Sequence, residues 1–185
     1  MSFSDNNSDI DTDIDTDIDT AINTATAIDI NIDSNGNEHS KYMNYRQMFS
    51  FLYAANIDGV GSILFSMKDF KPKSVKLKYN EFSEYVILAC LDALTMSKQN
   101  GWTKMRVYVN LNNCSMENFS LKMFKHINSL TANAFPETLD VCYVCSTTKL
   151  FKVIWEVVNK FIDPDTRPKF QLADDFSHLF ELYPV

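Results

Sequence analysis

Strand-like and helix-like segments alternate from residue 62 to residue 182, and this order is the strongest constraint on the fold. Short segments rich in β-branched and aromatic residues predict strands at 62–67, 104–111, 139–145 and 169–172. Each is followed by apolar residues at helical spacing, which predicts helices at 80–98, from Ser115 onward, at 148–162 and at 174–182. Such alternation is typical of an α/β protein with a mostly parallel sheet, right-handed crossovers and helices packed over the sheet.

One further helix is expected ahead of this alternation, within residues 42–53. Apolar residues there have the spacing of a short amphipathic helix at Tyr45, Met48, Phe49 and Leu52. A turn at 56–59 would separate this helix from the first strand. Between the first strand and its helix, a basic loop at 68–78 holds five lysines around Pro72.

The first 40 residues differ chemically from the rest of the chain. They carry ten acidic residues and no lysine or arginine, whereas residues 41–185 are mildly basic, so the net charge of −7 averages two unlike parts. Aspartate occupies every second position from Asp9 to Asp19. A strand would align these like charges on one face, and a calcium loop would need a nearby glycine and a distal glutamate. We therefore predict a disordered acidic tail over 1–40 and one domain over 41–185.

Several classes of protein are not expected. No apolar run approaches the roughly 20 residues of a membrane span, and the acidic start lacks a signal-peptide pattern. The overall negative charge disfavours nucleic acid. Cys142 and Cys145 form a C-x-x-C, but residues three apart on a strand point to opposite faces, so both are expected to be core cysteines without metal. The histidines and the four glycines form no catalytic or phosphate-binding motif, so neither an enzyme nor a cofactor is expected.

Residues 135–172 carry a more specific pattern. It consists of Pro136-Glu137-x-Leu139, the aromatic positions Phe151 and Trp155, and Phe161-Ile162-Asp163-Pro164-x-Thr166-x-x-Lys169. In these pieces and their spacing the chain resembles the CRAL-TRIO lipid-binding family, over roughly residues 59–184. The resemblance implies a bowl with the sheet as its floor and helices as its walls. It also implies that 148–162 is a mobile gate helix. The sequence departs from the family pattern in one respect, because the N-terminal three-helix region is expected to be missing from this version.

The resemblance further implies which residues contact a ligand. Glu137, Thr166 and Lys169 are expected at a lipid headgroup, where a lysine offers charge to a phosphate, a threonine offers a hydroxyl and a glutamate accepts hydrogen bonds. Strand alternation places four residues on one face, which the resemblance turns toward the pocket: Met105, Val107, Val109 and Leu111. The gate helix is expected to contribute Phe151, Ile154, Trp155 and Val158.

Simpler interpretations stay open at this stage. The apolar helix at 148–162 could be a fully buried core helix, and the segment from Asp163 to Thr166 could be only a helix stop with a capped turn. A one-residue error in register would invert the strand faces.

The leading functional interpretation is non-enzymatic binding, and intermembrane transfer, of a hydrophobic ligand such as the phospholipid phosphatidylinositol. The expected location is cytoplasmic and peripherally membrane-associated, with the lysines of 68–78 touching an anionic membrane surface transiently and the acidic tail competing for them. The alternative is a protein-interaction scaffold that binds a small GTPase or another protein partner. A thiol enzyme would need Cys142 and Cys145 on one exposed turn.

Overall fold

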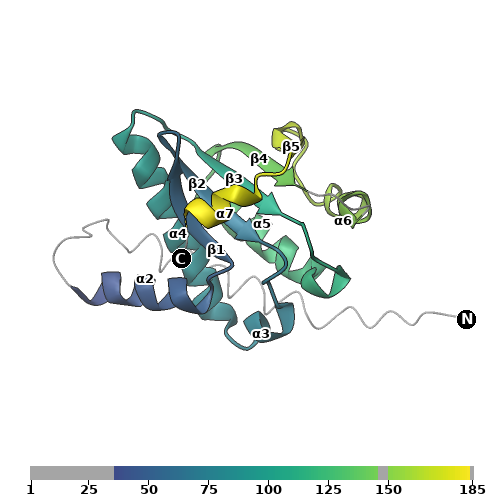
Figure 1. Ribbon diagram of the computed structural model, residues 1–185, viewed down its shortest axis with the longest axis horizontal. Coiled ribbons are helices and arrows are strands. Elements are labelled where there is room, and N and C mark those ends of the chain that lie inside the picture. Colours follow the sequence, from purple (N-terminus) through teal and green to yellow (C-terminus); the bar gives the residue numbers. More distant parts are fainter. Residues whose placement is uncertain (1–35, 146–149, 184–185) are drawn as a thin grey trace, which may run out of the picture.

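A five-stranded sheet organises the chain, whose computed structural model describes residues 36–145 and 150–183 (Figure 1). Its strands lie in sequence order: β1 (Leu52–Ile57), β2 (Val60–Ser66), β3 (Met105–Asn110), β4 (Leu139–Cys145) and β5 (Phe170–Ala173). β1 runs antiparallel to β2, and all later neighbours are parallel. The predicted α/β class with a mostly parallel sheet is therefore confirmed.

Helices cover both faces of this sheet (Figure 1). They are α2 (Gly36–Met48), α3 (Pro72–Lys76), α4 (Tyr79–Gln99), α5 (Leu121–Ala134), α6 (Leu150–Val158) and α7 (Ser177–Leu182), with single 3-10 turns at η1 (Met116–Asn118) and η2 (Arg167–Lys169). α7 lies on the face opposite α4 and α5, where Phe176 packs against Leu64 and Tyr108. Among the described residues, no helix combines the length and apolar character that crossing a membrane requires.

The prediction of a helix over 42–53 is wrong for the second half of that range. α2 ends at Met48, and the chain continues as β1, most of which is buried. Nearly every position of this buried strand is apolar, so its residues also fit the spacing of an amphipathic helix. Asp58 and Gly59 close the β1–β2 hairpin with φ of 52° and 81°, the left-handed geometry that Asp-Gly favours in tight hairpins.

Smaller differences concern where the elements begin. α2 starts at Gly36, so the boundary predicted at residue 40 falls inside a helix. The predicted disorder of the preceding residues 1–35 lies outside the described residues. The helix expected from Ser115 begins with η1, and α5 follows from Leu121. The basic loop at 68–78 contains the one-turn helix α3.

A dense aromatic cluster fills the space between α4 and the β1–β2 hairpin. The ring centroids of Phe49 and Phe82 are 5.2 Å apart, and those of Phe51 and Phe82 are 5.9 Å apart. α4 approaches β2 so closely that a Cβ on Gly61 would lie 1.6 Å from the backbone oxygen of Ala93. This contact fixes α4 against the sheet at backbone distance.

The two cysteines of the C-x-x-C face opposite sides of β4. Cys142 belongs to the core beneath α4 and α5, and Cys145 packs with Tyr108 and Phe176 beneath α7. Both are free thiols. The expected placement of the two cysteines in the core, on opposite faces of the strand, is confirmed.

Candidate ligand-binding cavity

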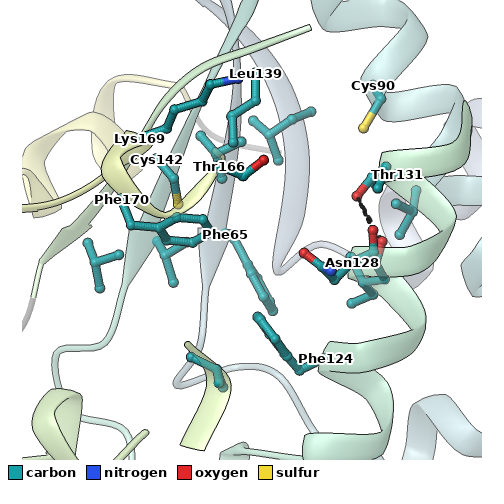
Figure 2. A pocket seen from close by; sticks show the side chains of 18 of the residues that line it. Phe65, Cys90, Phe124, Asn128, Thr131, Leu139, Cys142, Thr166, Lys169 and Phe170 are labelled. Carbon is teal, nitrogen blue, oxygen red and sulfur yellow. Dashed lines mark hydrogen bonds between the residues drawn. The ribbon is translucent and has the colours of Figure 1, made fainter. Parts of the chain in front are cut away.

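A largely apolar cavity of about 580 Å³ lies between the sheet, α5 and α6 (Figure 2). Its floor comes from β3 and β4, one wall from α4 and α5, and the other from α6 and the segment that leads to β5. The volume lies within the range of roughly 300–1,000 Å³ that is usual for sites that hold a small ligand.

The alternation of side chains along the strands determines which residues form the floor of the cavity. Met105, Val107, Val109 and Leu111 all line the cavity, as their predicted parity requires. Val107 and Val109 are only partly buried although β3 is the central strand, because their side chains face this space. From β4, Cys142 joins the floor.

The α5 wall mixes apolar and polar side chains. Met123, Phe124 and Ile127 line the cavity together with Asn128 and Thr131. The Thr131 hydroxyl donates to the backbone oxygen of Ile127, 2.8 Å away, and contacts that of Asn128 at 3.3 Å. Figure 2 shows Phe124, Asn128 and Thr131 on the same side of the space. This wall therefore offers polar contacts within an otherwise apolar surface.

The inner face of α6 lines the opposite wall. Phe151, Ile154, Trp155 and Val158 all border the cavity. The rings of Phe151 and Trp155 stack with centroids 5.8 Å apart, and Trp155 also packs on Phe170 of β5 at 5.6 Å. An extended aromatic surface therefore faces any ligand from this side.

The outer face of α6 and the turn after it remain exposed. Val153, Val157 and Phe161 are 51%, 36% and 40% exposed. The alternative of a fully buried core helix is therefore wrong. The end of this segment is tied to α5, because the Asn128 amide donates to the backbone oxygen of Phe161 at 3.3 Å and the Lys125 ammonium lies 4.0 Å from its ring centroid.

The polar mouth of the cavity lies where β4 and β5 begin. Glu137, Thr166 and Lys169 all border it, and the Lys169 ammonium lies 3.4 Å from the Glu137 carboxylate. The Lys169 side chain is only 20% exposed, whereas that of Glu137 is 82% exposed. The lysine is thus held at the cavity while its carboxylate partner reaches into solvent.

Two local features position these residues. Glu137 has a φ of 58° in the turn after Pro136, where the Thr138 amide donates to the backbone oxygen of Phe135 at 3.4 Å. A positive φ is uncommon outside glycine and concentrates at functional sites. In the turn before η2, the Asp163 carboxylate accepts from the Asp165 amide at 2.8 Å, while the Thr166 side chain makes no cap hydrogen bond and borders the cavity. The Asp163 side chain thus closes this turn, and Thr166 occupies the N-cap position of η2 without capping it through its side chain.

The charges at the mouth are mainly negative. Asp163 and Asp165 border the cavity together with Glu137, whereas Lys169 is the one basic residue among the described residues that line it. Deeper inside, Cys90 and Cys142 lie on opposite sides of the space (Figure 2). Burial raises the pKa of each thiol to about 12, so both are neutral at pH 7. Within the described residues, no three His, Cys, Asp or Glu side chains gather as metal ligands would.

Sequence reasoning missed part of this lining. It overlooked Asn128 and Thr131 on α5, the acidic pair Asp163 and Asp165, and Cys90 on α4. The available signal on α5 was two polar residues beside the apolar stripe of an otherwise amphipathic helix. The residues that were predicted all border the cavity, and their ligand contacts stay predictions.

This arrangement defines a domain with a largely apolar cavity and polar groups at one end of it, which suits a hydrophobic molecule with a polar end. The family model of the CRAL/TRIO domain matches residues 30–184, and the chain therefore belongs to the CRAL/TRIO domain family. Proteins of this family generally bind and transfer lipids rather than catalyse reactions, and membership supports binding of a lipid or another hydrophobic ligand.

Comparison with solved structures agrees with the fold. The structure described as "Crystal structure of Sfh5" is similar with a TM-score of 0.58 and 14% sequence identity, covering 92% of this chain and 68% of that one. Identity this low shows a shared fold alone. Among the curated proteins, no sequence matches this chain significantly.

Proposed function

We propose that this protein binds a phospholipid with one phosphate diester and a hydroxylated headgroup, phosphatidylinositol above all, and exchanges it with membranes without catalysing a reaction. The observation that carries the proposal is Lys169, whose side chain is only 20% exposed and whose ammonium lies at the mouth of an apolar cavity, with Thr166 beside the same opening. Acyl chains fit the apolar interior, because burial of methylene groups is worth about 0.8 kcal/mol each.

The charge balance at the mouth supports this headgroup. Lys169 can make a charge-assisted hydrogen bond to a single phosphate, and Thr166 can donate a second. The three carboxylates that border the opening accept hydrogen bonds from the hydroxyls of a neutral sugar-like ring. A ring bearing several phosphates would place more negative charge against the same carboxylates, and we expect it to bind less well.

The outer face of α6 supports exchange at a membrane. Its exposed apolar residues lie beside Lys152 and Lys160, a composition that suits the interface of an anionic bilayer. In this proposal α6 is the gate: it covers the ligand in one state and moves aside at the membrane in the other. The protein then works on the cytoplasmic side as a peripheral, transiently bound protein.

A Lys169→Gln variant tests the headgroup contact. Loss of a charge-assisted hydrogen bond of about 1.5–3 kcal/mol predicts at least tenfold weaker uptake of labelled phosphatidylinositol, with a smaller effect on diacylglycerol, which carries no phosphate. The control is Lys98→Gln, which removes an exposed charge from the last turn of α4. Equal losses for both lipids would assign Lys169 a structural role.

Native mass spectrometry of the full chain tests the ligand itself. A phospholipid that co-purifies in stoichiometric amount is the expected result. Protein that carries no lipid, and that also fails to take up labelled phosphatidylinositol, would refute lipid binding and favour a scaffold for a protein partner.

A further inference from the structure

The segment between β2 and α4 presents a basic surface that the cavity does not explain. Lys68, Lys71, Lys73, Lys76 and Lys78 are all exposed. Across the part of the chain that the structure describes, none of them pairs with a carboxylate. The one acidic residue of the segment, Asp69, already accepts a hydrogen bond from the Ser66 hydroxyl at 2.7 Å. The surface therefore keeps a net positive charge.

A large apolar side chain stands among these lysines. Leu77, between Lys76 and Lys78, is 87% exposed, more than any other large hydrophobic residue in the described ranges. Two further exposed apolar residues flank the segment. The Lys78 ammonium lies 3.3 Å from the sulfur of Met48, and Met116 is 52% exposed in the 3-10 turn that packs on the segment.

The segment is well anchored, so the exposure of Leu77 is not due to loose packing. Phe70 and Val75 are each only 3% exposed and hold both ends of α3 in the core. The side-chain amide of Asn118 donates to the backbone oxygens of Lys68 and Phe70, at 3.1 and 3.0 Å. A fixed backbone thus holds Leu77 in water near two exposed methionines, and a partner that buried this leucine would gain apolar contact.

We propose that residues 68–78 form a docking surface for an anionic lipid bilayer. Leu77 enters the interface between headgroups and acyl chains, and the surrounding lysines contact lipid phosphates. The acidic N-terminal segment of this chain would complement the lysines alone, whereas an anionic bilayer complements both the lysines and the leucine between them.

The position of this surface fits a role in lipid exchange. Met67 and Phe70 border the cavity at the edge where the parallel strands end, opposite the edge that carries Lys169. α6 starts from that same edge, because it follows β4. Docking through 68–78 therefore places the start of α6 close to the bilayer. This inference rests on the proposed function in one respect: lipid exchange requires contact with a membrane.

Vesicle sedimentation with the full-length chain tests the surface. The vesicles contain phosphatidylcholine alone or phosphatidylcholine with phosphatidylserine. A Lys73→Gln, Lys76→Gln double variant should bind the anionic vesicles about thirtyfold more weakly, since each lysine near the surface contributes roughly fivefold. Leu77→Ser should weaken binding about tenfold. Binding of the unaltered protein should fall with rising salt.

Matched controls separate this surface from general effects. Leu182→Ser removes another leucine, 67% exposed on α7, and should leave vesicle binding unchanged. Lys73→Arg with Lys76→Arg keeps the charge and should retain binding. Uptake of labelled lipid in detergent micelles should be unaffected in all variants, which distinguishes failure of the docking surface from failure of the cavity.

Unchanged vesicle binding by both the lysine and the Leu77 variants overturns the proposal. If the lysine variant instead makes the repeat from Asp9 to Asp19 easier to cleave by an aspartate-directed protease, with no loss of vesicle binding, the acidic repeat is the occupant and the bilayer is not.

Discussion

The sheet carries a packed half and a hollow half on the same side. Beneath α4, the β1–β2 hairpin meets Phe49, Phe51, Phe82 and Tyr85, whose buried rings pack against one another. Beneath α5 and α6, the floor is made of smaller side chains such as Val107 and Val109, and a cavity of about 580 Å³ remains. One core thus provides both rigidity and a binding space.

The difference lies in how closely the helices approach the sheet. At Gly61, α4 comes within backbone contact of β2 because no side chain intervenes. In the hollow half, α5 and α6 rest on each other through Phe124, Ile154 and Val158, and the cavity separates them from β3. The packed half therefore holds the sheet in place, and the hollow half depends on it for its shape.

Gly61→Ala should break the packed half and have the largest effect. The new Cβ would lie 1.6 Å from the backbone oxygen of Ala93, so α4 must move as a whole. We expect a loss of more than about 4 kcal/mol in the free energy of unfolding, or failure to fold, measured by urea denaturation. Gly101→Ala is the control: its Cβ would meet nothing within 4 Å, and its φ of 80° predicts a cost of only about 1–2 kcal/mol.

The same substitution in the two halves should differ in cost. Phe82→Ala removes a fully buried ring from the packed cluster and should lower the free energy of unfolding by about 3–5 kcal/mol. Phe124→Ala removes a ring that borders the cavity, so fewer contacts are lost, and we expect about 1–2 kcal/mol. Thermal or urea unfolding measures both. Equal costs would mean that the cavity is closed in solution.

Much of the fold could be predicted from the sequence, and the error has a clear cause. The alternation of strand and helix segments holds for β2 to β5, because turn and helix-end signals separate those elements. It fails at 52–57, where nearly every residue is apolar and the hydrophobic period is lost. The Asp58-Gly59 turn was recognisable, but pairing β1 with β2 required information about which residues are neighbours in space.

The cavity could be predicted only along elements with a regular period. Strand alternation predicts that Val107 and Val109 share a face, since every second residue does, and both border the cavity. Asn128 and Asp163 could not be found in this way, because they come from different elements that meet only in the folded chain. The positive φ of Glu137 was likewise invisible, since a glutamate gives no sequence signal for that geometry.

A larger side chain should lower stability in the packed half and lipid uptake in the hollow half. Ala89→Leu adds an isopropyl group at a fully buried position of α4 and should cost about 1–3 kcal/mol in the free energy of unfolding. Val109→Phe extends into the cavity and should change stability by less than about 1 kcal/mol, while lowering uptake of labelled phospholipid at least tenfold. Unfolding curves and a lipid-uptake assay on both variants give the comparison. Full lipid uptake by Val109→Phe would show that the ligand lies elsewhere.

The smallest effect on stability is expected at two of the non-glycine residues with positive φ, one taken from each half. Asp58 and Glu137 have φ of 52° and 58°, a conformation that glycine adopts without strain. Asp58→Gly and Glu137→Gly should each leave the free energy of unfolding unchanged or raise it by up to about 1 kcal/mol. Only Glu137→Gly removes a carboxylate from beside Lys169, so only this variant should weaken phosphatidylinositol uptake. The pair separates backbone geometry from chemistry: if both variants retain full uptake, the Glu137 side chain makes no contact with the headgroup, and if both lose it, the loss follows from the turns rather than from the carboxylate.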